Sequence, residues 1–291
     1  MKELRGTGVA MVTPFNADGD INFEHLQKLT EHLVSGGVNY LVVMGTTGES
    51  VTLTKEEKKA VLNSILETNN GRIPVVLGVG GNNTADIVTQ LEALDTTGLT
   101  AILSVSPAYN KPTQGGIYAH YTEVSKASPL PIILYNVPGR TGSNMLAETT
   151  LRLVRDFDNI IAIKEASGSL DQCTTILKDR PDGFMVISGD DTLSLPIIAS
   201  GGDGVISVVA NALPKEYSEL INASLNGDFA TAQKRQYQLF DLINMLFAEG
   251  NPAGVKCVLK MLGICEENVR LPLVQVSDAL RSKLKAQVSQ L

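Results

Sequence analysis

The sequence lacks the features that mark disulfide-rich and zinc-binding proteins. It contains no tryptophan and only three cysteines, Cys173, Cys257 and Cys265, with no CxxC spacing among them. An odd number of widely separated cysteines suits neither a disulfide framework nor a zinc site. We therefore expect small, reduced and partly buried thiols.

Long basic and long apolar runs are also missing. The 24 Lys and Arg residues are outnumbered by 31 Asp and Glu residues, and the net charge is -7. Because nucleic-acid affinity depends on cations that displace counterions, nucleic acid is not an expected partner. No stretch reaches the roughly 20 apolar residues of a membrane span, and the N-terminus, with Lys2, Glu3 and Arg5, does not have a signal-peptide layout. We expect a soluble cytoplasmic protein with no membrane contact.

Several motifs of common enzyme chemistry are absent. The sequence has no GxxxxGK[ST], no complete GxGxxG, no GxSxG and no HExxH segment. The three histidines, His25, His32 and His120, fall in predicted helices away from strand ends. Ligands and bases must converge on one pocket, so a histidine-based triad or metal site is not expected.

The chain does contain alternating strand and helix patterns, and hydrophobic residues make up 43% of its 291 residues. Short runs rich in Val, Ile and Leu alternate with helical patterns of about 10 to 15 residues, which is typical of βα units and a parallel sheet. The eight predicted strands are Gly8 to Pro14, Tyr40 to Gly45, Pro74 to Gly80, Ala101 to Pro107, Pro131 to Pro138, Ile160 to Ala166, Phe184 to Gly189 and Gly204 to Ala210. Eight such strands predict a closed (β/α)8 TIM barrel, an α/β fold, over an open doubly wound sheet.

The barrel is expected to occupy residues 1–225 and to be followed by a helical extension over residues 226–291. Within the extension, the periodicity predicts helices from Asp228 to Glu249 and from Ala253 to Leu262. Two capping boxes are predicted at helix starts, one from Thr54 and Glu57 and one from Ser169 and Gln172.

Lys164 and Glu165 are the only charged residues in the eight predicted strands. Side chains alternate along a strand, so Lys164 shares a face with Ala162 and Ala166. Small neighbours leave room for a long side chain, which suits the barrel lumen. The opposite face carries larger or charged residues, Ile161, Ile163 and Glu165.

An amine in the lumen would be chemically useful. Removing an ammonium group from water favours the uncharged amine, which is a nucleophile for carbonyl groups. The alternative is that Lys164 is paired with a buried carboxylate and has only a structural role. No acidic residue lies in any other predicted strand, so we favour a Schiff-base lysine.

Polar residues collect after four other predicted strands, at the barrel end where active sites form. After the second strand, Gly45 to Ser50 can present N–H groups and the hydroxyls of Thr46 and Thr47 to a small carboxylate, or can be only a glycine-rich turn. After the seventh, Asp190 and Asp191 could form an acid pair or a metal site, but helix capping by one and a rim position for the other are favoured.

The end of the fifth strand carries a phenol and a guanidinium group. Tyr135 can move protons at a Schiff base, or can be an ordinary core tyrosine. Arg140, in a loop held by proline and glycines, can form two hydrogen bonds with a substrate carboxylate, or can simply be solvated. Tyr109 supplies a second phenol on the loop after the fourth strand.

Seven segments, in this order and spacing, resemble the dihydrodipicolinate synthase and N-acetylneuraminate lyase superfamily of lysine-dependent pyruvate aldolases. They are GTTGES at 45–50, AYNKP at 108–112, YNVPGRTG at 135–142, IKEASG at 163–168, SGDD at 188–191, GVISV at 204–208 and NPAGVK at 251–256.

The resemblance implies a role for most of these residues. Lys164 would form the Schiff base with pyruvate, and Thr47 would hold the pyruvate carboxylate. Tyr135, Thr46 and Tyr109 would form a proton relay, with Tyr109 contributed by the adjoining subunit of a tight dimer. Lesser substrate contacts would come from Gly189, Ile206 and Asn251. The resemblance also implies a homotetramer of two tight dimers and no metal or organic cofactor.

Arg140 distinguishes the possible second substrates. The sialic-acid lyases lack this arginine and use a neutral sugar, whereas a bidentate cation suits an anionic aldehyde. The expected reaction is therefore condensation of pyruvate with L-aspartate 4-semialdehyde, in lysine and diaminopimelate biosynthesis. The alternatives are an N-acetylneuraminate or 2-keto-3-deoxy-sugar-acid lyase and, in a different class, a barrel that only senses an anionic metabolite.

Lysine-sensitive members of the superfamily have an allosteric cleft at the dimer interface. The matching positions are Ser50, Val51, Lys55, Lys58, Asn82, Asp86 and Ala108. Lys55 and Lys58 stand where sensitive members often have histidine, and Ala108 replaces a common aromatic residue. Two added cations would repel a cationic effector. We expect weak or absent inhibition by L-lysine.

Overall fold

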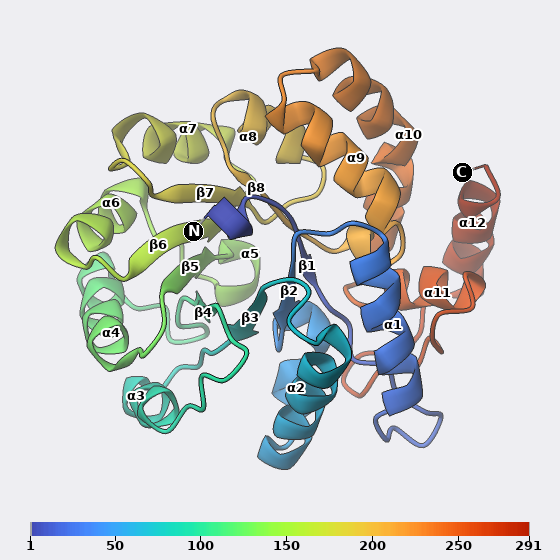
Figure 1. Ribbon diagram of the computed structural model, residues 1–291, viewed down its shortest axis with the longest axis horizontal. Helices are drawn as coiled ribbons and strands as arrows, with labels where there is room; N and C mark the ends of the chain where they lie inside the picture. Colours follow the sequence, from blue (N-terminus) through green and yellow to red (C-terminus); the bar gives the residue numbers. More distant parts are fainter. Residues whose placement is uncertain (1, 291) are drawn as a thin grey trace.

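Eight short parallel strands pair in sequence order, and the eighth pairs with the first. The computed structural model describes residues 2–290 and shows the strands as a ring at the centre of the molecule, with helices outside it (Figure 1). The strands are β1 (Gly6–Ala10), β2 (Tyr40–Val43), β3 (Val75–Gly78), β4 (Ala101–Val105), β5 (Ile132–Asn136), β6 (Ile160–Glu165), β7 (Met185–Ser188) and β8 (Gly204–Ser207). Pairing of Gly6 with Gly204 closes the ring, so the predicted TIM barrel is confirmed and the open sheet is wrong.

The predicted strands are all present, but they end one to four residues earlier than expected, and β1 begins two residues earlier. The apolar pattern runs past each strand because the first loop residues are also buried. Met11 and Val12 lie in the core outside β1, and Val209–Asn211 form a buried 3-10 turn after β8. The buried apolar run therefore continues beyond the last residue that has strand geometry.

The barrel has separate inner and outer cores, because strand side chains alternate. Ile133 and Tyr135 belong to the lumen cluster, whereas Ile132 and Leu134 pack under the helices. Ile161 was expected on the outer face, and this expectation is wrong: it lies in the lumen cluster. A register shift between β5 and β6 makes Ile161 an extra residue, and the predicted alternation resumes after it.

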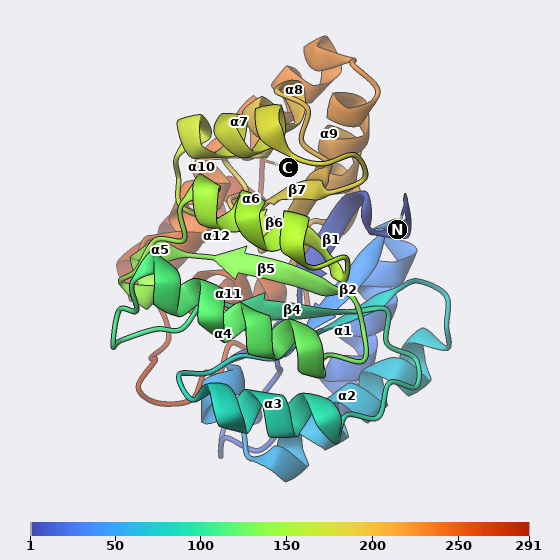
Figure 2. The same cartoon turned by 90° about the vertical axis from the view of Figure 1, so that its left-hand side faces the viewer.

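The helices that follow the strands cover the outside of the ring (Figure 2). They are α1 (Phe23–Ser35), α2 (Lys55–Asn69), α3 (Thr84–Glu92), α4 (Gln114–Ala127), α6 (Ala147–Asp156), α7 (Leu170–Asp179), α8 (Ser194–Ala199) and α9 (Pro214–Leu225). The short helix α5 (Pro138–Thr141) lies instead at the carboxyl end of β5 (Figure 2). Both hydrogen bonds of the capping box between Thr54 and Glu57 are present. At α7 only half of the predicted box forms, because the Gln172 side chain bonds Glu165 and the loop beside it.

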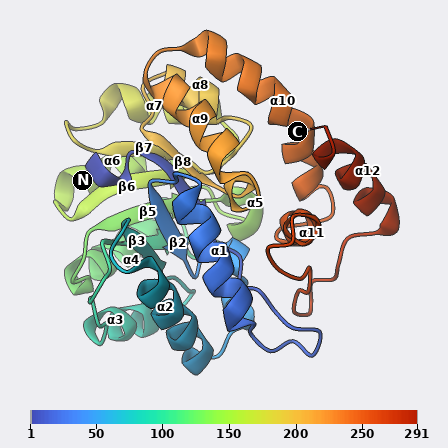
Figure 3. The same ribbon diagram turned by 45° about the vertical axis from the view of Figure 1, so that its right-hand side comes forward.

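Three helices follow α9 and pack beside the barrel (Figure 3). They are α10 (Phe229–Phe247), α11 (Ala253–Met261) and α12 (Asp278–Val288). The first two match the predicted helices to within two residues. Gln236 bonds the backbone of Thr192, and Arg270 bonds Glu57, so this extension is tied to the barrel loops. No helix between residues 2 and 290 combines the length and the apolar character needed to cross a membrane.

Candidate active site

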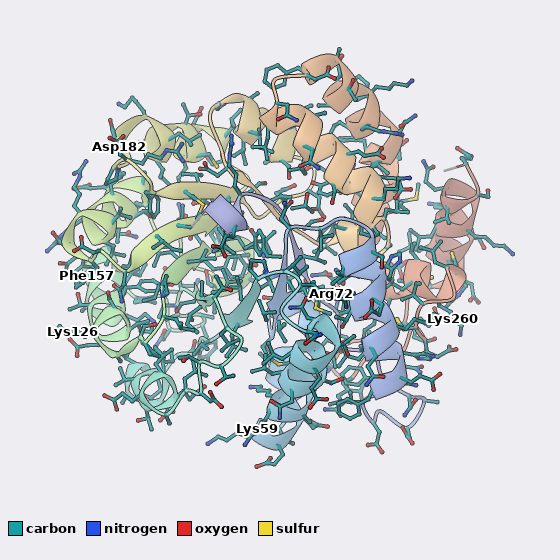
Figure 4. The ribbon with its side chains drawn as sticks, viewed as in Figure 1. Lys59, Arg72, Lys126, Phe157, Asp182 and Lys260 are labelled. Carbon is teal, nitrogen blue, oxygen red and sulfur yellow. The ribbon has the colours of Figure 1, made fainter. Side chains whose placement is uncertain are left out.

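Lys164 lies near the carboxyl end of β6 with its side chain in the barrel lumen. Charged side chains such as Lys59, Lys126 and Lys260 stand on the outer helices (Figure 4), whereas Lys164 is only 6% exposed. Its Nζ lies 4.3 Å from the centre of the ring of Tyr135, the residue of β5 that pairs with Lys164. Within residues 2–290, Nζ has no ion pair with a carboxylate, so the structural alternative gains no support.

Glu165 points to the opposite side of the sheet and is buried there. Its carboxylate accepts hydrogen bonds from Asn136 Nδ2, Gln172 Nε2 and the Ser167 N–H, at 2.7 to 3.1 Å. Asn136 in turn bonds Asn144 and the Met145 N–H. The network joins β6, which carries Lys164, to the end of β5 and to the loop that follows α5.

A cavity of about 360 Å³ opens above Lys164 at the carboxyl ends of the strands. It brings together seven of the nine predicted site residues, Thr46, Thr47, Tyr135, Arg140, Lys164, Gly189 and Asn251. Its wall also contains residues that sequence reasoning did not assign to the site, among them Val137, Ala166, Val208 and Phe247. The site is therefore built from loops far apart in the sequence.

Two predicted site residues lie outside this wall. Ile206 is buried in the lumen cluster of β8. Tyr109 is 89% exposed on the loop after β4, where it has a left-handed backbone with φ of 69°. Its N–H bonds the carbonyl of Thr141, which ties this loop to the end of α5. The phenol of Tyr109 is therefore not part of its own chain's cavity.

The turn after β2 is a 3-10 helix over Thr46–Gly48. Thr47 is buried, and its Oγ1 accepts a hydrogen bond of 2.9 Å from Asn251 Nδ2. The hydroxyl proton of Thr47 stays available because the amide occupies only an oxygen lone pair. The backbone N–H groups of Thr46 and Thr47 also have no acceptor within the described part of the chain. The turn can thus offer several donors to a small anion.

Arg140 lies on the short helix α5 at the rim of the cavity and is exposed. It forms no ion pair with any carboxylate between residues 2 and 290. A guanidinium group with free donors at the mouth of a cavity suits a carboxylate on an entering ligand.

Asp190 and Asp191 act separately. Asp190 borders the cavity and accepts bonds from the N–H and hydroxyl of Thr192. Asp191 is buried and accepts bonds from the Val208 and Val209 N–H groups, and burial raises its pKa. Neither caps α8, so the predicted capping role is wrong; the two carboxylates instead hold turns after β7 and β8.

The histidines and cysteines lie away from the cavity. His120 is buried in α4 and bonds the hydroxyl of Thr84, and burial lowers the pKa of His120 to about 4. The three cysteines are free and buried, and burial raises the pKa of each thiol, that of Cys173 to about 12.

Sequence reasoning missed a second buried lysine near the site. Lys256 of α11 is fully buried and its Nζ lies 2.5 Å from Glu49 Oε1. Neither residue falls in a strand, so the search for charges in predicted strands did not find them. The available signal was that one belongs to the GTTGES segment and the other to NPAGVK.

The residues predicted to match an allosteric cleft lie together on one side of the turn. Five of them line a cavity of about 410 Å³: Ser50, Val51, Lys58, Asn82 and Ala108. Lys55 and Lys58 share an adjoining groove between α2 and α3, whereas Asp86 lies on neither wall. The two predicted lysines therefore stand on or beside this region, and Lys59 lines the same groove.

Known proteins resemble this chain over its full length. The sequence model of the Dihydrodipicolinate synthetase family matches residues 3–291. A relative from Flavobacterium psychrophilum, named 4-hydroxy-tetrahydrodipicolinate synthase, is 50% identical over 291 residues, which are 100% of this chain and 99% of the relative.

Solved structures agree with this match. The chloride-inhibited dihydrodipicolinate synthase of Acinetobacter baumannii, complexed with pyruvate, superposes with a TM-score of 0.95 at 38% identity and covers 98% of both chains. A monomeric dihydrodipicolinate synthase variant superposes with a TM-score of 0.96 at 38% identity, over 99% of this chain and 97% of the variant.

Proposed function

This chain belongs to the dihydrodipicolinate synthetase family, and we propose that it condenses pyruvate with L-aspartate 4-semialdehyde through a Schiff base on Lys164. The observation that carries this proposal is a buried lysine without a carboxylate partner in the described chain, at the floor of a cavity that Tyr135, Thr47 and Arg140 also line. This is the arrangement that an amine nucleophile needs. The relatives are named 4-hydroxy-tetrahydrodipicolinate synthase, which agrees with this reaction.

The first step joins Lys164 to pyruvate. The uncharged amine attacks the keto carbon, and loss of water leaves an imine. Thr47 and the free N–H groups of the turn bind the pyruvate carboxylate, which orients the keto group toward Nζ. The Tyr135 ring lies beside Nζ and lines the same cavity, and we assign to its phenol the proton transfers of imine formation.

The imine then withdraws electrons and makes the methyl group of the pyruvate unit acidic. Removal of a methyl proton gives an enamine, whose carbon attacks the aldehyde of the second substrate. Arg140 at the rim binds the carboxylate of that substrate. The amine of the semialdehyde finally attacks the imine carbon, closes the ring and releases the amine of Lys164.

The assembly is part of the same proposal. We place Tyr109 in the neighbouring subunit's site, which accords with its 89% exposure and its position away from its own cavity. A homotetramer of two tight dimers and a cytoplasmic location complete the proposal. Sedimentation velocity tests the assembly, since the relatives include a monomeric variant; a monomer with full activity would remove the role of Tyr109.

The substrate test compares aldehyde classes in the wild type, Arg140→Ala and Arg140→Lys. Loss of a charge-assisted pair costs about 1.5–3 kcal/mol, so Arg140→Ala should lower kcat/KM for aspartate semialdehyde about 10- to 100-fold. Arg140→Lys keeps the positive charge but not the two parallel donors of the guanidinium group, so its kcat/KM should lie between those of the wild type and Arg140→Ala. Pyruvate adduct formation should persist in both variants. Faster turnover of N-acetylmannosamine by the wild type would instead assign the chain to the sugar-acid lyases.

A further inference from the structure

The segment from Asn251 to Lys256 holds the turn after β2 at two points. Asn251 Nδ2 bonds Thr47 Oγ1 at 2.9 Å, and Lys256 Nζ lies 2.5 Å from Glu49 Oε1. This segment runs from the link after α10 into the first turn of α11 and belongs to the extension beyond the barrel. In Figure 2 the extension lies behind the barrel, toward the end at which the β5 arrow points. The extension therefore contacts the turn from its buried side.

The second contact is a fully enclosed ion pair. Lys256 Nζ also donates to the Asn268 carbonyl at 2.8 Å and lies 4.3 Å from the centre of the Phe15 ring. The other oxygen of Glu49 accepts the Arg270 N–H at 2.9 Å. All the polar partners of the Glu49 carboxylate within residues 2–290 thus come from the extension. Burial lowers the pKa of Lys256, and the negative charge of Glu49 opposes that shift.

A buried ion pair is not an efficient source of stability. The desolvation of two charges offsets their attraction, so an apolar pair of similar volume often serves as well. What the pair does provide is a directional connection between two segments 207 residues apart. Stability alone therefore does not account for the buried pair of Glu49 and Lys256, whereas the position of Glu49 just after Thr46 and Thr47 suggests a role in the site.

Glu49 is coupled directly to the residues above it. Its backbone is left-handed, with φ of 53°, and its N–H bonds the Thr46 carbonyl at 3.0 Å. A shift of the Glu49 carboxylate would accordingly move the short turn that presents Thr46 and Thr47 to the cavity. Displacement of a binding group by about 1 Å is enough to weaken substrate placement.

We propose that Glu49 and Lys256 are positioning residues, which fix the donors of the Thr46–Thr47 turn relative to Lys164 and so set the affinity for pyruvate. The inference rests on the proposed function and adds a role for the extension. It predicts an effect on pyruvate that is separable from the effect on the semialdehyde, since Arg140 reaches the cavity from a different element, α5.

The experiment compares Lys256→Met, the double variant Glu49→Gln/Lys256→Met and a control, Arg180→Met. Arg180 forms a half-buried ion pair with Asp203, at the amino ends of β7 and β8 and far from the turn. Each protein is titrated with pyruvate in the presence of borohydride, and the trapped fraction is read by intact mass. Steady-state KM values for both substrates and urea unfolding are measured alongside.

Both Lys256 variants should need about tenfold more pyruvate for half-maximal trapping, equivalent to about 1.4 kcal/mol, with the semialdehyde KM changed less than about twofold. The double variant should recover stability, because it removes both buried charges, but should not recover pyruvate affinity. The control should bind pyruvate normally. Recovery of affinity together with stability would reduce the pair to a structural role and overturn the inference.

If Lys256→Met does not fold, the pyruvate affinity of the double variant tests the inference. Wild-type pyruvate affinity in the folded double variant also overturns the inference. Absence of any trapped adduct in the wild type is a different result, since it removes the Schiff base itself and hence the proposed function.

Discussion

Replacement of Glu165 tests whether the two faces of β6 have separate roles, because this residue adjoins Lys164 in sequence but points away from it. The Glu165 carboxylate is 1% exposed and serves three donors, from Asn136, Gln172 and Ser167. Glu165→Ala removes all of these acceptors, whereas Glu165→Gln keeps the shape of the side chain and one carbonyl oxygen.

The expected losses follow from the partners. In Glu165→Ala the Ser167 N–H loses the carboxylate oxygen that it bonds, whereas Asn136 Nδ2 keeps its bond to Asn144 Oδ1 and Gln172 Nε2 keeps its bond to the Met145 carbonyl. An unpaired buried donor costs about 1–3 kcal/mol and each lost hydrogen bond about 1 kcal/mol. We therefore expect a free energy of unfolding lower by about 3–5 kcal/mol for Glu165→Ala and by about 1 kcal/mol for Glu165→Gln.

Urea unfolding measures these differences, and borohydride trapping with pyruvate measures the amine. Both variants, where folded, should still form the pyruvate adduct, because the amine lies on the lumen side. A folded Glu165→Gln protein that forms no adduct would show that Glu165 acts on Lys164 and would refute the separation of faces. Unchanged stability of Glu165→Ala would refute the role of the network.

Two other predictions concern His120 and the groove between α2 and α3 that contains Lys55 and Lys58. Burial holds the pKa of His120 near 4 in the folded chain against about 6.5 when unfolded. The unfolded state therefore binds the extra proton first, and stability should fall by about 2 kcal/mol between pH 7 and pH 5; His120→Gln should lack this component in urea unfolding. With Lys55 and Lys58 beside the second cavity, millimolar L-lysine should leave the reaction rate nearly unchanged, and micromolar inhibition would contradict this.

The fold was predictable because alternation and burial are local properties. The eight apolar runs, the lumen position of Lys164 and the outward position of Glu165 all follow from a two-residue period. The same rule failed at Ile161, since an extra residue in one strand is set by pairing with β5 and has no local signal. It also overextended the strands, because the first residues after several strands are as buried as the strands themselves.

Which residues gather around Lys164 in the candidate site could be predicted in part from the sequence, but the contacts between distant residues could not. The cavity contains Lys164, Tyr135, Thr47 and Arg140 as expected. The capping box at Ser169 forms only in half, because the Gln172 side chain bonds Glu165 instead of the helix start. A tertiary contact here replaces the local one that the sequence predicts. The pair of Glu49 and Lys256 joins positions 207 residues apart, and only the folded chain brings them into contact.

The most direct test of the central claim locates the carbon–nitrogen bond. The protein is incubated with pyruvate and borohydride, digested, and mapped by mass spectrometry in the wild type and in Lys164→Ala. The account predicts one reduced adduct per chain, on Lys164 and not on the other buried lysine, Lys256, and no adduct in the variant. An adduct on a different residue, or one that persists without Lys164, would contradict it.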